Sequence, residues 1–278
     1  MKRKNLIATK KVKNNNFLLK NPKILNFYKK FKTIIYKDVK KKDFALAVSG
    51  GSDSLCLAYF SKVYAKELGN KIHVLIVDHN LRKESYKEAL QVKEILKKRK
   101  IPSKILRWKG PVLRSNLQKN ARDLRYLLIS NYCLKKNIKY VATAHHGDDQ
   151  IENFFIRLLR GSGLTGLSSM SQTVSFNRNF NIIRPFLEFK KTDIKNNTLE
   201  YFKKFINDPS NDNDKFLRVR IRKYRSKMAS EGLDTSKIIK TINNLSSSYD
   251  AINFYKKRAI KKYVKFIKEN KCLINRNL

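Results

Sequence analysis

Residues 44–55 read FALAVSGGSDSL: an apolar, β-prone run, then a loop of small residues, then the start of a helical pattern. The apolar part, Phe44–Val48, is typical of a buried strand, and the pattern after the loop is typical of a helix. Between them, Gly50 and Gly51 allow positive φ angles and let backbone amides come close to a ligand. The stretch therefore predicts a strand, a glycine turn and a helix in succession.

The second half of the loop indicates what the turn binds. Ser52, Asp53 and Ser54 stand at positions typical of helix N-caps, so the loop opens toward the positive end of a helix dipole. Such a corner attracts anions, and phosphate is the usual one. An ordinary strand-to-helix turn with a serine cap is the alternative. A Walker A loop is excluded because no Gly-Lys-Ser/Thr follows, and a dinucleotide fingerprint because no third glycine enters the helix.

Strand and helix patterns alternate from this loop onward. The expected strands are Phe44–Val48, Ile72–Val77, Ile101–Trp108, Lys139–Thr143 and Ile182–Arg184. The expected helices between them lie near Leu55–Leu68, Lys83–Arg99, Leu113–Lys136 and Asp148–Arg160. This alternation predicts an α/β fold with a doubly wound, mostly parallel sheet, in which ligands bind at the carboxyl ends of the strands.

Three segments are expected along the chain. Residues 1–42 form a basic N-terminal extension with one helix around Ile24–Tyr36, and residues 43–215 form the α/β domain that carries the motifs. Residues 216–278 form a small all-α domain, helical from Phe216 to about Glu269. The boundary near Lys215 follows a connecting run that is rich in Asn, Asp, Pro and Ser.

Composition narrows the class of protein. The chain has 278 residues and is 41% hydrophobic, enough for a sizeable core, and no segment approaches the ~20 apolar residues of a membrane span. The basic start leads into no apolar signal region. Cys56, Cys133 and Cys272 are far apart and form no C-x-x-C, which argues against a disulfide scaffold, a zinc knuckle or an iron–sulfur cluster. We therefore expect a cytoplasmic protein with no membrane partner.

The charge points to a polyanion. The net charge is +41, from 63 Lys and Arg against 22 Asp and Glu, which favours nucleic acid as the partner. Composition drift in an AT-rich genome is the alternative, since 46 of the 63 basic residues are Lys. Drift does not explain where the arginines fall, because they gather in short helical patterns. Arginine in a lysine-dominated chain favours directed phosphate contacts over a merely solvated face, and the RNA-binding candidates are Arg122, Arg125, Arg160, Arg218, Arg222 and Arg225.

The densest polar cluster is ATAHHGDDQIE at residues 142–152. On a helix, His145 and Asp149 are four apart and Asp149 and Glu152 three apart, so the three would share one face. This spacing suits a metal site, or a site that grips a cationic substrate and takes its proton. A solvated, capped helix is the alternative. Asp78 and His79 follow the second strand, where they would contact a ligand or cap the next helix.

These motifs resemble those of a known family. SGGSDS at 49–54 is similar to the loop of the N-type ATP pyrophosphatases, which split ATP into AMP and pyrophosphate. The full ordered set resembles the tRNA(Ile)-lysidine synthetase family over about Phe44 to Arg222: VDHNLR, NLQKNARDLRY, ATAHHGDDQIE, RLLRGSGLTGL, IIRPF and DPSNDNDKFLRVRIR. Two positions depart from the family pattern, Ser169 in place of a glycine and Asn153 in place of a threonine. Longer members also carry a second C-terminal domain.

The resemblance implies a reaction and its participants. ATP would be bound by Ser49, Gly50, Gly51, Ser52, Asp53 and Ser54, with Asp78 and His79 beside it, and Asp53 would help to hold Mg²⁺. The enzyme would adenylate C2 of the wobble cytidine in the CAU anticodon of a minor isoleucine tRNA, and the ε-amine of free L-lysine would then displace AMP. Asp149 and Glu152 would bind that lysine, with His145 close by. We assign the amine's proton to His145 or to one of the carboxylates as a hypothesis.

Two other functions are consistent with parts of the sequence. A tRNA 2-thiocytidine-type sulfur transferase would use the same loop, but it would normally want paired cysteines. A non-catalytic, basic RNA-binding protein could keep a relic of the nucleotide loop, against which the intact Asp53, His145, Asp149 and Glu152 argue. The sequence does not give the oligomeric state, and a homodimer is consistent with it.

Overall fold

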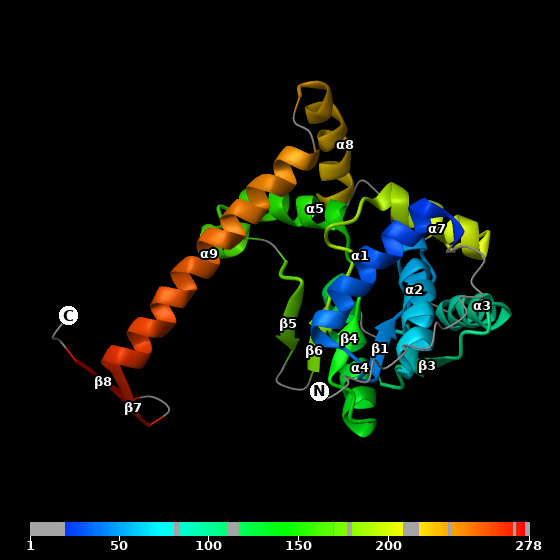
Figure 1. Cartoon of the computed structure of the whole chain (residues 1–278), viewed down its shortest axis with the longest axis horizontal. Coiled ribbons are helices and arrows are strands. Elements are labelled where there is room, and N and C mark those ends of the chain that lie inside the picture. The colour runs from blue at the N-terminus through cyan, green and yellow to red at the C-terminus, as the bar shows by residue number, and fades with distance from the viewer. Residues whose placement is uncertain are drawn as a thin grey trace, which may run out of the picture. The chain divides into compact units, whose positions relative to one another are not determined.

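A computed structural model describes residues 20–80, 84–110, 117–168, 170–176, 180–207, 217–232, 235–268 and 271–275. Ser169, residues 113–116 of an expected helix, the expected boundary near Lys215 and most of the basic extension lie outside these ranges. The chain divides into two compact units (Figure 1). Unit 1 comprises Met1–His146 and Gln172–Asp208, and unit 2 comprises Gly147–Ser171 and Pro209–Leu278.

Unit 1 is built on a six-stranded sheet in the order β3-β2-β1-β4-β6-β5. Five strands are parallel and β5 runs antiparallel to β6. The strands are β1 (Phe44–Ala47), β2 (Ile72–Asp78), β3 (Ser103–Arg107), β4 (Tyr140–Ala142), β5 (Thr173–Phe176) and β6 (Phe180–Ile183). Strand order reverses between β1 and β4, which is the switch point where ligands bind in such sheets. The predicted doubly wound, mostly parallel fold is confirmed, and β5 was not predicted.

Helices cover both faces of this sheet. They are α1 (Pro22–Asp38), α2 (Ser52–Leu68), α3 (Ser85–Lys98), α4 (Leu117–Lys135) and α7 (Lys191–Phe202). Because successive strand residues point to opposite faces, Phe44 and Leu46 join the larger core with α1, α2, α3 and α7, whereas Ala45 joins a smaller core with α4. The period-two division of β1 thus accounts for two separate cores.

Helix α1 belongs to the core of unit 1. Phe31 is fully buried, and the ring of Phe27 stacks on that of Phe60 with centroids 4.9 Å apart. The expected domain boundaries at 42/43 and near 215 stay a prediction, and the compact units divide the chain elsewhere. Residues 22–38 group with the sheet, and residues 147–171 group with the C-terminal helices.

Unit 2 contains α5 (Gly147–Leu158), α6 (Leu164–Leu167), α8 (Leu217–Ser230) and α9 (Thr235–Tyr263), followed by the hairpin β7 (Val264–Lys268) and β8 (Lys271–Ile274). Its small core is formed by Ile151, Ile238 and Ile242. The expectation of helix to about Glu269 is wrong beyond Tyr263. Val264, Phe266 and Ile267 are β-branched or aromatic residues that favour a strand, and the pairing with β8 shifts register between Phe266 and Lys268, where the alternation with lysine breaks. Within the described ranges, no helix is both long and apolar enough to cross a membrane.

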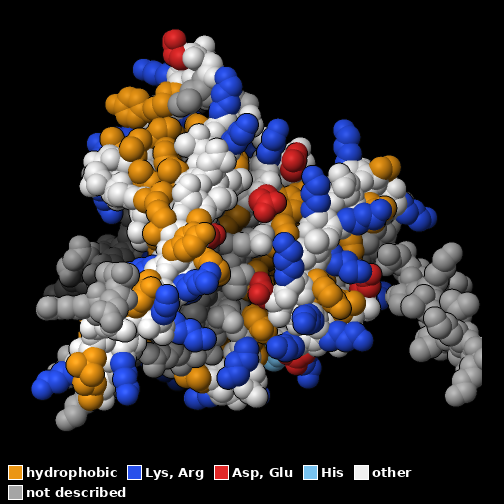
Figure 2. Space-filling model, turned by 60° about the vertical axis from the view of Figure 1, so that its left-hand side comes forward, with side chains coloured by type: hydrophobic (Ala, Val, Ile, Leu, Met, Phe, Trp, Pro, Cys, Tyr) orange, Lys and Arg blue, Asp and Glu red, His pale blue; other side chains and the backbone are white. Residues whose placement is uncertain are grey.

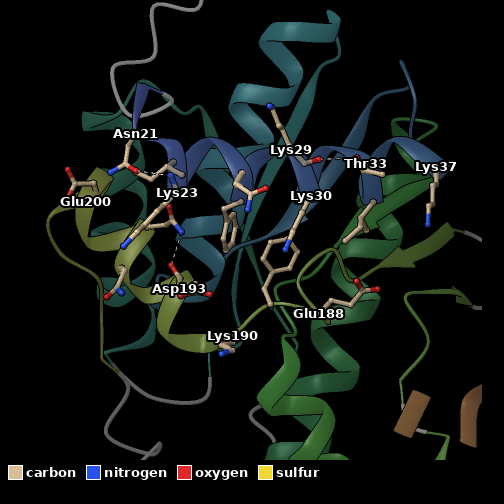
Figure 3. A pocket seen from close by; sticks show the side chains of 17 residues that line it. Asn21, Lys23, Lys29, Lys30, Thr33, Lys37, Glu188, Lys190, Asp193 and Glu200 are labelled. Atoms are coloured by element: carbon tan, nitrogen blue, oxygen red, sulfur yellow. Dashed lines mark hydrogen bonds between the residues drawn. The ribbon is translucent and has the colours of Figure 1, made fainter. Parts of the chain in front are cut away.

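A groove of about 1030 Å³ lies along α1, α7 and the segment before α7, all in unit 1 (Figure 3). Its lining carries both signs of charge, with Lys23, Lys29, Lys30, Lys37 and Lys190 beside Glu188, Asp193 and Glu200. No sequence motif lies here, and the mixed charge selects no single class of ligand.

Candidate functional site

The glycine loop joins β1 to α2 at the switch point of the sheet. Gly50 has a φ of +88°, in the region that favours glycine. A Cβ on Gly50 would also lie 2.5 Å from Cγ2 of Val92 and 3.2 Å from Cδ1 of Ile206. Both conformation and space therefore require glycine at this position.

The start of α2 differs in detail from the expectation. The N-cap is Gly51, which makes no side-chain cap, and Ser52, Asp53 and Ser54 form the first helical turn. The expectation that these three occupy cap positions is wrong, because the helix already begins at Ser52. The amides of a first turn have no carbonyl one turn earlier to bond, so they remain suited to an anion.

Ser54 closes the loop on itself. Its Oγ accepts bonds from the amides of Ser49 (3.2 Å) and Gly50 (3.1 Å) and donates to the carbonyl of Gly51 (3.0 Å). The hydroxyl of Ser49 also lies 3.3 Å from the Oγ of Ser54. The loop is thus fixed by its own side chains before any ligand enters.

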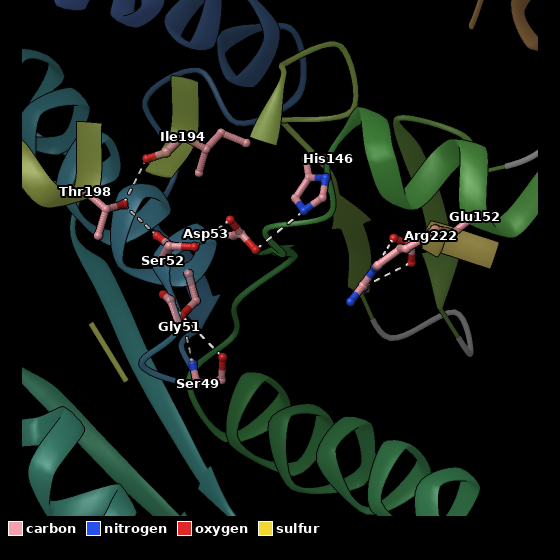
Figure 4. Close-up of polar contacts among 10 residues, drawn as sticks. Ser49, Gly51, Ser52, Asp53, His146, Glu152, Ile194, Thr198 and Arg222 are labelled. Atoms are coloured by element: carbon pink, nitrogen blue, oxygen red, sulfur yellow. Dashed lines mark hydrogen bonds and ion pairs between the residues drawn. The ribbon is translucent and has the colours of Figure 1, made fainter. Parts of the chain in front are cut away.

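Asp53 pairs with a histidine that sequence reasoning did not select. His146 is buried, and its Nε2 lies 3.5 Å from Oδ2 of Asp53, while the Oγ of Ser52 donates to Oδ1 at 3.0 Å (Figure 4). Although burial raises the pKa of Asp53, the contacts with His146 and Ser52 and the charge of Lys191 bring that pKa below its ordinary value. The carboxylate is therefore charged and held in place beside the loop.

His145 has a different neighbour. Its Nδ1 lies 3.0 Å from Oγ1 of Thr143, and α5 begins only at Gly147. The prediction that His145 shares a helical face with Asp149 and Glu152 is therefore wrong, whereas the latter two do lie three apart on α5. Two adjacent histidines gave no sequence signal for which one contacts Asp53, because the contact is made in the fold between segments far apart in the sequence.

Asp78 and His79 lie at the end of β2 in different roles. Asp78 is buried, and its Oδ1 accepts bonds from the amide of Asn80 (2.9 Å) and the hydroxyl of Ser85 (2.7 Å), while Oδ2 pairs with Arg107 (3.2 Å). Asp78 therefore ties the end of β2 to the start of α3 through the Ser85 hydroxyl, but the N-cap position of α3 is Glu84, and whether Asp78 contacts a ligand stays a prediction.

His79 lies with its Nε2 3.5 Å from a guanidinium nitrogen of Arg125. Burial and the charge of Arg125 lower the pKa of His79 to about 4, so its imidazole is neutral at pH 7.

This histidine gives the fold a pH dependence. Since the pKa of His79 in the folded state is below its ordinary value near 6.5, the unfolded chain binds the extra proton first. Stability from this group is present above about pH 6.5 and is lost as the pH falls toward 4. We expect the free energy of unfolding to fall by about 1 kcal/mol between pH 7 and pH 5, after allowance for solvent screening. Urea titrations of the wild type and His79→Gln check this, since equal losses in both would contradict it.

Arginines gather near the carboxyl ends of β2 and β6. Arg122 lies over the ring of Tyr126 at 5.4 Å. Burial lowers the pKa of Arg125 and of Arg184; Tyr126 raises both, and the nearby charge of Arg122 lowers both. Arg184 is buried and was not among the candidates, although it stands in the IIRPF motif. Sequence reasoning missed it because it looked for helical stripes.

In unit 2 the carboxylates of α5 bind arginines of α8. Glu152 is buried and accepts from Nε (2.5 Å) and Nη2 (3.2 Å) of Arg222 (Figure 4). Asp148 pairs with Arg225 at 2.5 Å. The bond with Glu152 raises the pKa of Arg222 although burial lowers it. Arg222 and Arg225 therefore face acids within unit 2, while Arg160 and Arg218 are exposed.

The candidate residues fall into two groups. Unit 1 holds the loop with Asp53, His145 and His146, together with Asp78, His79, Arg122 and Arg125. Unit 2 holds Asp149, Glu152, Arg160, Arg218, Arg222 and Arg225. The roles assigned to these residues stay predictions.

The fold and the loop together define an α/β domain with a phosphate site at its switch point. Residues 23–227, most of the chain, match the family model of the PP-loop domain, and the chain belongs to this family. The chain is 44% identical over 178 residues to a tRNA(Ile)-lysidine synthase of Orientia tsutsugamushi, covering 64% of this chain and 40% of that protein. It is 37% identical over 222 residues to one of Wolbachia pipientis wMel, covering 77% and 50%. The chain thus spans about half the length, or less, of these curated relatives.

A solved structure agrees with the fold. The U34-tRNA thiolase NcsA of Methanococcus maripaludis, solved with its [4Fe-4S] cluster, superposes with a TM-score of 0.66 at 16% identity, covering 81% of this chain and 80% of that one. At this identity the likeness supports the PP-loop fold alone.

Proposed function

We propose that this protein is an ATP-dependent ligase that joins L-lysine to C2 of the wobble cytidine in the CAU anticodon of a minor isoleucine tRNA. The observation that carries the proposal is the glycine loop, closed by Ser54 at the switch point, in a chain whose relatives are named tRNA(Ile)-lysidine synthases. The reaction would form lysidine and release AMP and pyrophosphate.

The first step would take place at the loop. The amides of the first turn of α2 would receive the phosphates of ATP, and the cytidine would attack the α-phosphorus as the bond to pyrophosphate breaks. Mg²⁺ is held in proteins by one or two carboxylates together with substrate phosphates, so the charged Asp53 fits this role. The described residues contain no group of three or more His, Cys, Asp or Glu that could hold a metal by themselves. Mg²⁺ would supply charge neutralisation on the phosphates.

The second step needs a site for lysine. Its ε-amine would attack C2 of the adenylated cytidine, the bond to AMP would break, and the amine's proton would pass to a base. We propose Asp149 and Glu152 for binding, as their place on one face of α5 suits a cation. Because both oxygens of Glu152 bind Arg222, lysine would have to share that carboxylate or replace Arg222 on it.

The transfer RNA would be held by charge. Lys and Arg side chains are spread over the face seen in Figure 2 and exceed Asp and Glu there. We assign the exposed Arg160 and Arg218 to phosphate contacts, together with Arg122 and Arg125 of unit 1.

The sulfur-transferase alternative gains no support from the two buried cysteines, Cys56 and Cys133. Burial raises the pKa of Cys133 to about 12 and holds the pKa of the Cys56 thiol well above its usual value. Both thiols are therefore poor sources of the thiolate that sulfur transfer requires.

One experiment tests the proposal. Protein, Mg-ATP and labelled lysine are incubated with minor isoleucine tRNA that carries C or U at the wobble position, and label is counted in the RNA. We expect label in the C form alone, and none in either form would overturn the proposal. Asp149→Asn should raise the KM for lysine at least tenfold, since a buried or half-buried charge pair contributes about 1.5–3 kcal/mol. An unchanged KM would remove Asp149 from the lysine site.

A further inference from the structure

Thr198, on α7, is fully buried against the first turn of α2. Its Oγ1 donates to the carbonyl oxygen of Ser52 at 2.7 Å and lies 3.0 Å from the carbonyl of Ile194, one turn back in its own helix (Figure 4). A hydroxyl carries one proton, so the shorter contact, to Ser52, receives the stronger bond. The same hydroxyl lies beside the thiol of Cys56, where it lowers the pKa of that thiol against a larger rise from burial.

The two preceding carbonyls of the loop are also held. The carbonyl of Gly50 accepts from the amide of Ile206 at 2.9 Å, just after α7. The carbonyl of Gly51 accepts from the hydroxyl of Ser54 at 3.0 Å and from the amide of Leu55 at 3.1 Å. Three successive loop carbonyls are thus bonded, two of them by groups in or just after α7.

Fixing the carbonyls fixes the amides. In a planar trans peptide, the C=O of one residue and the N–H of the next point in opposite directions. Bonds to the carbonyls of Gly50, Gly51 and Ser52 therefore hold the amides of Gly51, Ser52 and Asp53 on the opposite side. Those amides lie at the start of α2, where they can bind phosphate oxygens. A loop free to rotate would instead present carbonyl oxygens, which repel phosphate.

We propose that Thr198 is a positioning residue of the phosphate site, and that α7 holds the loop in its anion-binding state through the Ser52 carbonyl. The inference rests on the proposed use of ATP, in which the loop receives the β- and γ-phosphates. Thr198 makes its contacts behind the loop, with Ser52, Ile194 and Cys56. Its effect should therefore depend on whether the ligand carries a pyrophosphate group.

The test compares two substitutions at one position. Thr198→Val keeps the shape and removes the hydroxyl, and Thr198→Ser keeps the hydroxyl. Binding of inorganic pyrophosphate, ATP and AMP is measured by titration calorimetry with Mg²⁺ present. For Thr198→Val we expect about five- to tenfold weaker binding of pyrophosphate and ATP, the worth of about one hydrogen bond, and less than a twofold change for AMP. Thr198→Ser should stay within twofold of the wild type for all three ligands.

The control is Thr33→Val on α1. Thr33 also donates to a carbonyl one turn back, that of Lys29 at 3.0 Å, and its side chain lines the groove along α1. It should leave all three affinities unchanged. If Thr198→Val does not fold, Thr198→Ala serves with the same expectations.

Two outcomes would overturn the inference: wild-type affinity for pyrophosphate in Thr198→Val, or equal weakening of AMP and pyrophosphate. A wild-type protein that binds pyrophosphate but transfers no lysine would overturn the proposed function and leave this inference standing. A wild-type protein that binds no pyrophosphate would overturn both.

Discussion

Gly50→Ala is expected to destabilise the protein by about 2–5 kcal/mol and to abolish ATP binding. A left-handed φ costs a residue with a Cβ about 1–2 kcal/mol, and overpacking adds about 1–3 kcal/mol. Both apply at Gly50, with a φ of +88° and Cγ2 of Val92 only 2.5 Å from the new atom. Relief of the contact would move the loop, whose amides are the proposed phosphate ligands.

A matched glycine separates the two causes. Gly69 also has a positive φ, +78°, at the C-cap of α2, but a Cβ there would meet nothing within 4 Å. Gly69→Ala should therefore lose only about 1 kcal/mol, with unchanged ATP affinity. Denaturant unfolding and nucleotide titration of both variants make the comparison. Equal destabilisation by the two substitutions would show that space around Gly50 does not matter.

Glu152→Ala is expected to lower the free energy of unfolding by about 2–3 kcal/mol. The substitution leaves the guanidinium of Arg222 without its paired carboxylate, and removal of one partner from a buried ion pair is strongly destabilising. We expect less than the roughly 3–5 kcal/mol lost when a fully buried pair is broken, because the Arg222 side chain is 34% exposed. Asp148→Ala should cost less, since both members of its pair with Arg225 are partly exposed.

A double-mutant cycle isolates this pair. Glu152→Met combined with Arg222→Met removes both charges and should be less destabilised than the sum of the two single substitutions, with a coupling of about 1 kcal/mol or more. Thermal or urea unfolding gives the four values. Additive losses would mean that the two side chains do not interact. Binding of lysine would then be the only role left for the carboxylate of Glu152.

The sheet was predictable because its strands are short apolar runs between clear helical patterns. β1 and β2 follow the predicted bounds within one residue, as does the helix after the glycine loop at its C-terminal end. β5 was missed because TVSF is short, half polar and pairs only at the edge of the sheet. The hairpin of unit 2 was missed because lysine-rich segments fit a helix as easily as a strand.

The contacts of the candidate site were less predictable than its residue types. The loop, Asp53 and the α5 carboxylates follow from local spacing. The hydrogen bond from Thr198 to Ser52 joins residues 146 positions apart in the sequence, and no motif in α7 predicts it. The partner of Asp53 is the second of two adjacent histidines, His146, which lies in a bridge with Phe186 that local spacing does not reveal. Arg222 and Arg225 carry the positive charge expected of residues that bind RNA. Only the folded structure shows that they are already paired with the carboxylates of Glu152 and Asp148.

The discontinuity of unit 1 has a consequence for synthesis on the ribosome. β4 pairs with β1 on one side and with β6 on the other, yet residues 147–171 of unit 2 are made between β4 and β6. A nascent chain that has emerged only as far as His146 therefore exposes one edge of β4, and its glycine loop lacks both Thr198 and Ile206. The edge strand and the support behind the loop arrive only with residues 172–206. Folding of the nucleotide site must wait for them, although the loop itself is made within the first fifth of the chain.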